Sequence, residues 1–415
     1  MGGKVCINRF HIQCYQAGRT AHALQSCTPC QLLMMNSKER REGRYQRRKE
    51  AREAMKLKLA GTYDCYENVI SANALYRAAK QSRKTIRFKA SVQRYFMSLL
   101  RNIWTLREKL TRQDRVTMGF ICFKVHDRGK ERDIRSVHFK ERVAQRALCD
   151  EALVPMLSRN LVYDNGASLA NKGIHFALNR CKAHLQKYYR SNGFSNSGWV
   201  LLIDFSGYFD NVEHAPILRQ LRRAFTDERI IRLTWRFVKC FGQKSLGIGS
   251  QVSQILAVSY PGEVDHYAKE VLGLRYGGRY MDDSYYFHQD RKHLEECLEK
   301  LKEKYEPLGI RLHPRKTQII PIQRFTFLKV RFYLTGKGAV VMKPCQASIT
   351  RMRRKLRKFR ALLEHKSMTM DDIMRAYQSW RGYVGHLDSH KTIREMDKLF
   401  YELYKIWPEP MKKGA

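Results

Sequence analysis

Two adjacent aspartates, Asp282 and Asp283, lie inside the aromatic segment "RYMDDSYYF" of residues 279–287. Neighbouring carboxylates repel one another unless a positive charge or a cation neutralises them. A third carboxylate, Asp204, ends the short apolar segment "WVLLIDF" of residues 199–205. Carboxylates that converge from separate strands can hold two Mg²⁺ ions, which activate a hydroxyl group and stabilise the leaving oxygen in phosphoryl transfer. The sequence therefore indicates a site for metal-assisted phosphoryl transfer.

A surface β-turn is the alternative interpretation of the two adjacent aspartates, because aspartate is common in turns. The tyrosine, methionine and phenylalanine residues around the pair favour a less exposed setting. We expect residues 199–205 to form a buried strand and residues 277–288 to form a hairpin. A tight turn in this hairpin would aim one carboxylate of the pair at the metal ions, while the other holds the turn or contacts a metal more weakly.

The composition and net charge of the chain indicate which kind of partner it binds. Of its 415 residues, 43% are hydrophobic, which is enough for two or three compact units. Lysine and arginine outnumber aspartate and glutamate by 79 to 39, giving a formal net charge of +40. So one-sided a charge predicts a polyanionic partner. Because there is no apolar run near about 18 residues and no lipidation signal, we expect nucleic acid and no membrane.

The N-terminal segment differs from the rest in its cysteines and charge. Eleven cysteines in the chain and no signal peptide indicate a reducing, cytoplasmic compartment. The "CTPC" of residues 27–30 has zinc-knuckle spacing, but the cysteines before it fit no standard zinc pattern. We therefore expect residues 1–35 to be a disordered leader and leave the zinc site open. Residues 36–65 predict a basic arm or helix, which contacts phosphate groups or is simply a charged surface.

Helical and extended segments alternate around the three carboxylates. Residues 116–139 alternate polar and apolar side chains around the turn signal "DRGK", which predicts a β-hairpin with basic residues at its tip. Helical spacing recurs on both sides of the first strand and again after the aspartate pair. These further elements are helices at 66–115, 140–157, 173–190, 214–225 and 291–309, strands at 310–322 and 325–334, and helices after Lys343.

Six segments resemble, in the same order, the sequence motifs of reverse transcriptases. "YMDD" is similar to their catalytic box, and "LIDFSGYFDNVEH" to the first motif of their palm. The other four resemble the fingers motif, the template-side motif, the following helix–strand motif and the primer grip. The six lie at residues 129–148, 202–214, 247–254, 280–283, 308–318 and 325–330. The chain thus resembles a reverse transcriptase of bacterial or phage type.

This resemblance implies an α+β fold of the right-hand polymerase type, with fingers, an antiparallel-sheet palm backed by helices, and a helical thumb. It places the fingers with part of the palm at residues 66–198, the palm with its catalytic motifs at 199–335 and the thumb at 343–410. The implied reaction extends a primer 3′-OH on an RNA template. Its cofactors are two Mg²⁺ ions, for which Mn²⁺ can substitute, and its substrates are dNTPs.

The resemblance also assigns chemical roles to single residues. Asp204, Asp282 and Asp283 would be metal ligands, together with the backbone carbonyl group of Phe205. Lys316 matches the lysine that protonates pyrophosphate in the family. Its plainer interpretation is an ordinary exposed lysine on a strand.

Phe209 lies five residues after Asp204, where the family places an aromatic gate. A ring there would crowd a ribose 2′-OH and admit a deoxyribose, so that dNTPs are selected; a buried core phenylalanine is the alternative. Basic side chains of the predicted hairpin would cradle the triphosphate, because charge spreads over its oxygens during transfer. The residues assigned to nucleotide binding are Lys130, Arg132, Arg135, Phe209 and Gln254.

Template and primer contacts are implied by the remaining motifs. Gly249 permits a close backbone approach to a base pair. The "YM" before the aspartates and the "FLK" of the primer grip complete the set. The residues assigned to template and primer are Gly249, Ser253, Tyr280, Met281, Phe327, Leu328 and Lys329.

The template-side motif departs from the usual pattern at Gln254, where most reverse transcriptases have proline. The "SQ" of residues 253–254 resembles the enzymes of diversity-generating retroelements, although antiphage-defence and other unclassified enzymes also depart from the motif. In the first group the altered motif is associated with errors opposite template adenines. The alternatives that stay open are a defence enzyme, a template-independent polymerase, and a non-catalytic basic RNA-binding protein. The implied partners are an RNA template, a DNA or RNA primer, and an accessory protein or structured non-coding RNA.

Overall fold

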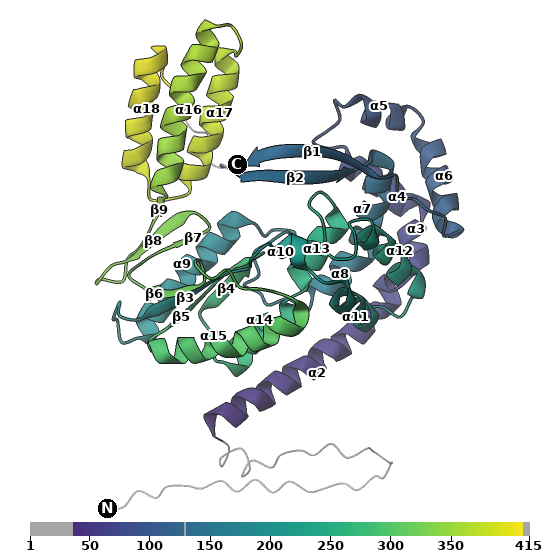
Figure 1. Ribbon diagram of the computed structural model, residues 1–415, viewed down its shortest axis with the longest axis horizontal. Helices are drawn as coiled ribbons and strands as arrows, with labels where there is room; N and C mark the ends of the chain where they lie inside the picture. Colours follow the sequence, from purple (N-terminus) through teal and green to yellow (C-terminus); the bar gives the residue numbers. More distant parts are fainter. Residues whose placement is uncertain (1–35, 128–129, 410–415) are drawn as a thin grey trace, which may run out of the picture. The chain divides into compact units, whose positions relative to one another are not determined.

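The computed structural model describes residues 36–127 and 130–409 (Figure 1). The predicted leader and its "CTPC" segment therefore lie outside the described residues. The first described element is the long basic helix α2 (Ser37–Tyr63), in the segment predicted as a basic arm. Four shorter helices follow: α3 (Tyr66–Ile70), α4 (Ala72–Ser82), α5 (Ala90–Met97) and α6 (Leu99–Thr111).

The predicted β-hairpin is confirmed. Strands β1 (Phe120–Asp127) and β2 (Lys130–Val137) pair antiparallel, with Phe120 opposite Val137 and Asp127 opposite Lys130. The two strands form a sheet of their own. Phe120, at the base of the hairpin, packs against the ring of Phe241 with centroids 4.7 Å apart.

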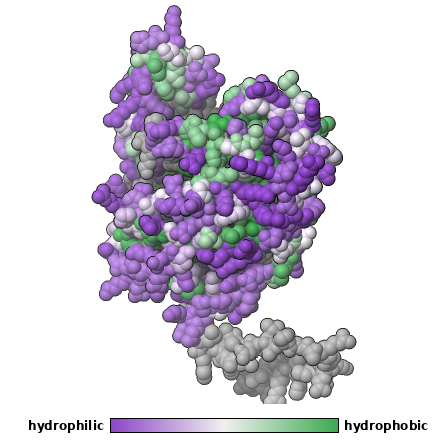
Figure 2. Space-filling model, turned by 45° about the vertical axis from the view of Figure 1, so that its right-hand side comes forward, coloured by the Kyte–Doolittle hydropathy of each residue, from purple (hydrophilic) through white to green (hydrophobic). Residues whose placement is uncertain are grey.

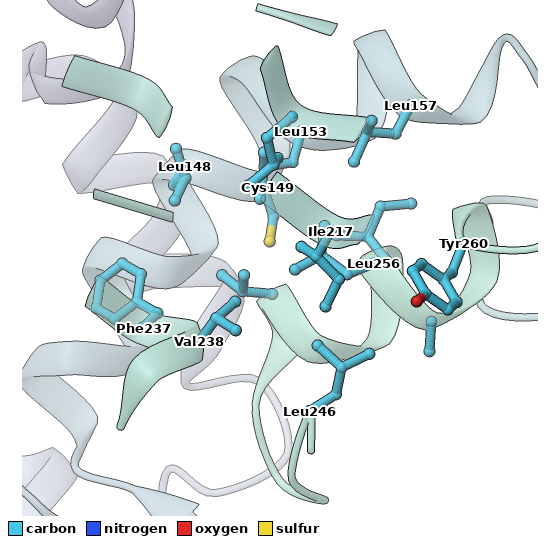
Figure 3. Close-up of a cluster of buried hydrophobic side chains, with 14 of the residues drawn as sticks. Leu148, Cys149, Leu153, Leu157, Ile217, Phe237, Val238, Leu246, Leu256 and Tyr260 are labelled. Atoms are coloured by element: carbon cyan, nitrogen blue, oxygen red, sulfur yellow. The ribbon is translucent and has the colours of Figure 1, made fainter. Parts of the chain in front are cut away.

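Helices between the hairpin and the central sheet build the larger hydrophobic core. Figure 3 shows part of it, where leucines of α7 and the turns after it meet α11, α12 and α13. Tyr260, at the end of α13, closes one side of this cluster and is 5% exposed. These helices are α7 (Phe139–Leu148), which runs through a π-helical turn (Cys149–Leu153) into α8 (Val154–Ser158), then α11 (His214–Ala224), α12 (Glu228–Lys239), α13 (Gln251–Ser259) and α14 (Gly262–His266), with a second π-turn at Tyr267–Val271.

The central antiparallel sheet has four strands in the order β4-β5-β3-β6. Strand β3 lies inside it and is buried on both faces: Leu201 and Ile203 face one core cluster, and Val200 and Leu202 face the other. Because both faces of this strand are buried, its sequence is continuously apolar and does not alternate with polar residues. The strands are β3 (Trp199–Asp204), β4 (Gly277–Tyr280), β5 (Asp283–His288) and β6 (Gln318–Pro321).

Two helices cover opposite faces of this sheet (Figure 1). Helix α15 (Arg291–Tyr305) packs Leu294, Leu301 and Tyr305 into the larger core, and a short 3₁₀ turn (Glu306–Leu308) follows it. Helix α9 (Ile174–Ser191) contributes Cys181 and Leu185 to the core on the other face. The sheet is thereby held between two helical layers, as predicted for an antiparallel sheet backed by helices.

A three-stranded antiparallel sheet, β7-β8-β9, follows the central sheet along the chain. It shares the second core with α9, and the three helices after it form a bundle with a separate core. Leu387, in the turn before the last helix, packs into the second core, and the backbone N–H of Asp388 donates to Met342 at 2.8 Å. The elements are β7 (Arg324–Phe327), β8 (Val330–Leu334), β9 (Val340–Pro344), α16 (Gln346–Glu364), α17 (Met370–Gly385) and α18 (His390–Tyr404).

The surface in Figure 2 is mainly hydrophilic, with hydrophobic side chains gathered in its upper part. Large apolar residues that reach the surface include Ile121 and Phe123 on strand β1, which are 51% and 48% exposed. Within residues 36–127 and 130–409, no helix has the length and apolar character needed to cross a membrane.

Candidate active site

The end of strand β3 and the start of strand β5 bring two of the predicted carboxylates side by side. In the antiparallel register, Asp204 is directly opposite Asp283. Tyr280, the last residue of β4, pairs with Asp283, so Met281 and Asp282 form a two-residue turn between the strands. We call residues 280–283 the aspartate turn. The chain thus folds all three aspartates to one end of the central sheet.

The aspartate turn has a constrained backbone. Met281 has a φ of +55°, a left-handed conformation that costs a residue with a side chain about 1–3 kcal/mol. The N–H of Phe205 donates to the carbonyl of Asp282 at 3.1 Å, which ties the turn to the end of β3. The ring of Phe205 is buried against Tyr208 and Tyr305, so this backbone contact is anchored in the larger core.

Mutual repulsion of the carboxylates appears in the pKa of Asp283. Burial first, then the negative charges of Asp282 and Asp204, raises this pKa from 3.8 to about 7. The ammonium group of Lys316 opposes the rise, since its Nζ lies 2.8 Å from both Oδ1 and Oδ2 of Asp204. A cation at this end of the sheet would favour the charged form of all three side chains.

The carboxylates suit Mg²⁺ in chemical kind. The described residues do not hold three or more histidine, cysteine, aspartate or glutamate side chains close enough together to form a metal site by themselves. Asp204 is paired with Lys316 instead. Mg²⁺ commonly binds through one or two carboxylates, with water and substrate phosphate as its other ligands. The pair Asp204 and Asp283, with Asp282 beside it, meets that requirement.

Lys316 lies in a turn rather than on the predicted strand of residues 310–322. The N–H of Thr317 donates to the carbonyl of His313 at 2.9 Å, which closes the turn. The intervening Pro314 has no N–H to donate to a sheet, so a continuous strand is disfavoured. The N–H of His313 donates to the carbonyl of Asp204 at 2.7 Å, and this contact sets the turn beside the carboxylates.

Phe209 belongs to the short helix α10 (Tyr208–Asn211), just after the end of strand β3. It is partly buried against the larger core, and its ring meets that of Tyr208 edge-on at 5.8 Å. The carbonyl of Phe209 accepts the N–H of Leu246 at 2.9 Å, which ties α10 to the loop before α13. The ring is therefore neither a fully buried core residue nor a freely exposed one.

Gly249 lies where the loop before α13 touches strand β2. Its φ is +124°, and a Cβ at this position would come within 2.6 Å of the carbonyl oxygen of Arg135. The N–H of Arg135 donates to the carbonyl of Ile248 at 3.1 Å, so the hairpin is bound to the loop. The close approach that requires glycine is thus to the hairpin backbone. Arg135 itself is exposed, whereas the side chains of Lys130 and Arg132 lie outside the described residues.

Ser253 and Gln254 point in different directions from helix α13. Ser253 is 1% exposed, and its hydroxyl group donates to the carbonyl of Leu246. Gln254 is exposed on a helix whose other residues are mostly buried. Of the two, only Gln254 has an exposed side chain, while Ser253 holds the loop that carries Gly249.

Sequence reasoning missed a buried polar chain behind this loop. Glu141 accepts the N–H of Met118 and the amide of Gln145, each at 3.0 Å. The Gln145 side chain in turn accepts the hydroxyl of Ser250 at 2.9 Å. Burial raises the pKa of Glu141. The one available signal is that Glu141 and Gln145 are spaced by four residues on an otherwise apolar helical face.

The predicted primer-grip residues form a second two-residue turn. Phe327 pairs with Val330, which leaves Leu328 and Lys329 at the tip, with φ angles of +48° and +63°. We call residues 327–330 the lysine turn. Positive φ at both central residues is the mark of a type I′ hairpin, for which Asn-Gly is the usual sequence.

The lysine turn and the strand of the aspartate turn share a core. The ring of Phe327 meets that of Tyr285 at 4.8 Å and 68°, an edge-on contact. Leu328 and Tyr280 are both partly buried against the same cluster. The predicted primer contacts are therefore joined to the carboxylates through packed side chains.

Comparison with known proteins identifies the central region. Residues 132–332 match the family model described as reverse transcriptase (RNA-dependent DNA polymerase). The chain is 26% identical to protein YkfC of Escherichia coli (strain K12) over 151 residues. That match covers 34% of this chain and 38% of YkfC, so it spans well under half of that relative.

Two solved telomerase structures are similar at low identity. Telomerase from Candida albicans in complex with the TWJ fragment of telomeric RNA gives a TM-score of 0.45 at 11% identity, covering 75% of this chain and 66% of that one. Apo telomerase from Candida tropicalis gives a TM-score of 0.44 at 11% identity, covering 69% of this chain and 58% of that one.

The family match and the sheet with its paired aspartates assign residues 132–332 to the nucleic-acid polymerase class of domain. More particularly, residues 132–332 are a reverse transcriptase domain. The predicted α+β fold, with an antiparallel sheet backed by helices, is confirmed. The six segments that resemble family motifs, at residues 129–330, coincide with this domain.

Proposed function

We propose that this protein is an RNA-directed DNA polymerase that extends a primer 3′-OH on an RNA template with dNTPs. The observation that carries the proposal is the cross-strand pair of Asp204 and Asp283, with Asp282 in the adjoining turn. A pair of strands that sets like charges opposite one another is unfavourable unless a cation joins them. The family match supplies the reaction class that uses such a site.

The residues that would hold two Mg²⁺ ions are Asp204, Asp282 and Asp283, with the backbone carbonyl of Phe205. Bound there, the ions would activate the primer hydroxyl and neutralise charge on the leaving phosphate, and Mn²⁺ could replace them. The chain itself would contribute a rigid arrangement of these carboxylates. Paired strands and the Phe205 N–H fix the carboxylates before any substrate arrives.

Lys316 is proposed to donate a proton to the leaving pyrophosphate. Its side chain is 49% exposed, so the ammonium group can exchange protons with water. Its turn is bound to the backbone of Asp204, which keeps the Nζ beside the carboxylates. General acids placed in this way typically contribute about 10²- to 10⁴-fold to the rate.

Nucleotide selection is proposed for Phe209, Arg135 and Gln254. The ring of Phe209 is partly exposed beside the carboxylate end of β3, where a 2′-OH would meet it. Arg135 is exposed on strand β2 and would contact the triphosphate together with Lys130 and Arg132. Gln254 presents the only exposed side chain of residues 252–258 in helix α13.

The path of the nucleic acid is proposed to follow the basic surfaces. Helix α16 buries Ile349, Met352 and Leu356, so its basic residues face outward. Contacts by about six to ten such side chains would make binding fall by about 10³–10⁵ between low and moderate salt. We assign the fingers with part of the palm to residues 66–198, the palm to 199–335 and the thumb to 343–410. The exposed basic residues of α16 are Arg351, Arg354, Lys355, Arg357, Lys358 and Arg360.

The biological setting is proposed from the "SQ" of the template-side motif. An enzyme of a diversity-generating retroelement would make errors opposite template adenines and would use an accessory protein or structured RNA. An antiphage-defence enzyme would copy adenines faithfully. Sequencing of cDNA made in vitro separates the two. The described cysteines are free thiols, in keeping with a reducing, cytoplasmic compartment.

Primer extension on a defined RNA template tests the proposed reaction. We expect DNA synthesis that needs the template and prefers dNTPs to rNTPs, and Phe209→Ala should relax this preference. Incorporation without a template would favour a template-independent polymerase. Equal incorporation by the wild type and Asp282→Ala/Asp283→Ala would leave a non-catalytic RNA-binding protein as the better account.

A further inference from the structure

A buried ion pair lies directly beneath the aspartate turn. Arg279, on strand β4, is 1% exposed, and Asp265, on helix α14, is 2% exposed. The guanidinium Nε donates to both carboxylate oxygens of Asp265 at 3.0 and 2.9 Å, and Nη2 donates to Oδ2 at 2.8 Å. The two charges are thus fully withdrawn from water and satisfy one another in a forked geometry.

The remaining donors of Arg279 reach backbone carbonyl groups. Nη2 donates to Val258, on helix α13, at 2.8 Å, and Nη1 donates to Met281, in the aspartate turn, at 3.0 Å. One guanidinium group therefore joins three elements: the helix that carries Gln254, the helix that carries Asp265, and the turn that presents Asp282.

The backbone of Arg279 is also held, by hydrogen bonds to residues 164 and 166. Its N–H donates to the carbonyl of Asp164 at 3.2 Å, and its carbonyl accepts the N–H of Gly166 at 2.9 Å. Because main chain and side chain are both held by other contacts, the position of Nη1 does not depend on the turn. The carbonyl of Met281, a residue with positive φ, accepts from this fixed donor.

Stability alone does not account for this pair. Replacing a buried ion pair with apolar side chains of similar volume is often neutral or stabilising, so the pair is poor evidence for a purely structural role. An apolar pair could fill the same space, but it could not donate to the carbonyl of Met281. The contact with the turn is the feature that only an arginine at this position supplies.

We propose that Arg279, oriented by Asp265, is a positioning residue that holds the Met281–Asp282 turn in the conformation in which Asp282 and Asp283 receive a divalent cation. This inference rests on the proposed polymerase function, because it concerns the same carboxylates. Arg279 touches neither substrate nor metal. It acts through the backbone of the turn, so its loss should weaken metal binding before it affects template binding.

Two variants of Arg279 separate positioning from folding. Arg279→Lys keeps the charge opposite Asp265 but lacks the fork that reaches Met281. The double variant Arg279→Met/Asp265→Leu removes both charges and retains an apolar filling, so it should fold even where the lysine does not. The matched control is Arg381→Lys. Arg381 is also buried, at 6% exposed, and pairs with Asp397 at 3.0 Å, but in the C-terminal helix bundle.

Mn²⁺ binding to the full chain without substrate, measured by electron paramagnetic resonance, is the direct readout. We expect Arg279→Lys and the double variant to raise the Kd for Mn²⁺ by about 10- to 100-fold, as loss of outer-shell partners typically does. Arg381→Lys should leave this Kd unchanged. In primer extension, Arg279→Lys should lower kcat and demand more Mg²⁺, with little change in the KM for primer–template.

Wild-type Mn²⁺ affinity in the folded double variant would overturn the proposal. So would equal effects of Arg279→Lys and Arg381→Lys on Mn²⁺ binding. A wild-type protein that binds Mn²⁺ but extends no primer would refute the polymerase function alone, because the positioning of the carboxylates would still be measurable.

Discussion

The aspartate turn and the lysine turn both hold side-chain-bearing residues at positive φ, but they do so by different contacts. Each is a two-residue hairpin tip with a non-glycine residue at positive φ: Met281 in the first, Leu328 and Lys329 in the second. The first is fixed by polar contacts, from the guanidinium of Arg279 and the N–H of Phe205. The second packs Phe327 and Leu328 against the shared core, and the carbonyl of Lys329 accepts the N–H of Cys345 at a longer 3.4 Å.

This difference fits the role that we propose for each turn. A turn that presents carboxylates to a cation needs a fixed backbone, and directional hydrogen bonds to its carbonyl groups provide it. A turn that supports a strand of nucleic acid needs a stiff, shaped surface, which packed apolar side chains provide. Glycine would relieve the backbone strain at either tip, and the proposed ligand contacts would account for the side chains that stand there instead.

Removing one of the three carboxylates at this end of the sheet should have the largest effect. We expect Asp282→Asn or Asp204→Asn to lower the rate of primer extension by about 10³-fold, because a bound metal contributes several kcal/mol to transition-state stabilisation. Single-turnover kinetics on a fixed primer–template measures this. The exposed Asp371→Asn in the C-terminal bundle is the control, and a loss of similar size there would contradict the assignment.

Lys316 and its neighbour Arg315 give the next comparison. We expect Lys316→Ala to slow extension by about 10²-fold, since a positioned proton donor is lost. Arg315→Ala, in the same exposed turn, should have little effect. Single-turnover rates of the two variants on the same primer–template check the role. Equal losses in the two variants would assign the effect to general positive charge.

Asp283 should make the metal-free protein less stable as the pH rises. Its pKa of about 7 in the folded chain lies above its ordinary value of 3.8, so the folded state holds the proton more tightly than the unfolded state. The resulting stability is complete below about pH 4 and is lost as the pH rises through about 7. Asp283→Asn should remove this pH dependence and add about 2 kcal/mol to the free energy of unfolding at pH 8. Urea unfolding with a chelator, at pH 5 and pH 8, measures it; parallel pH dependence in the two proteins would be the contrary result.

The tip of the lysine turn should show the smallest effect, and its two readouts should move in opposite senses. Replacing Lys329 with glycine relieves the positive φ of +63° and keeps the packing of Leu328, so it should stabilise the chain by about 1 kcal/mol. The KM for primer–template should nevertheless rise by about 10-fold, because the lysine side chain assigned to primer contact is gone. Thermal unfolding and steady-state kinetics report the two quantities. An unchanged KM would remove the lysine turn from the primer path.

Much of the site follows from local patterns in the sequence. The apolar run before Asp204 predicts a buried strand, and the residues around Asp282 and Asp283 predict a hairpin, so the convergence of the aspartates could be anticipated. The register that sets Asp204 opposite Asp283 could not, because it depends on how the two strands align across the sheet.

Other features depend on contacts between distant segments, and no local pattern reveals them. In the sequence, Arg279 is simply a basic residue within a predicted strand. Its role becomes visible only in the fold, which places Asp265 and the carbonyl of Met281 next to it. Leu328 and Lys329 have positive φ, but neither is a glycine, so the sequence gives no sign of this turn. Lys316 was predicted on a strand, and the turn closed at His313 instead places it against Asp204.

Iron-directed cleavage tests most directly whether the end of β3 and the aspartate turn form one divalent-cation site. With Fe²⁺ in place of Mg²⁺, and with ascorbate and peroxide, a bound ion cuts the backbone next to its ligands. The account predicts cuts both near residues 203–206 and near residues 280–284, and both should disappear in Asp282→Asn. Cleavage confined to one segment, or unchanged by that substitution, would contradict it.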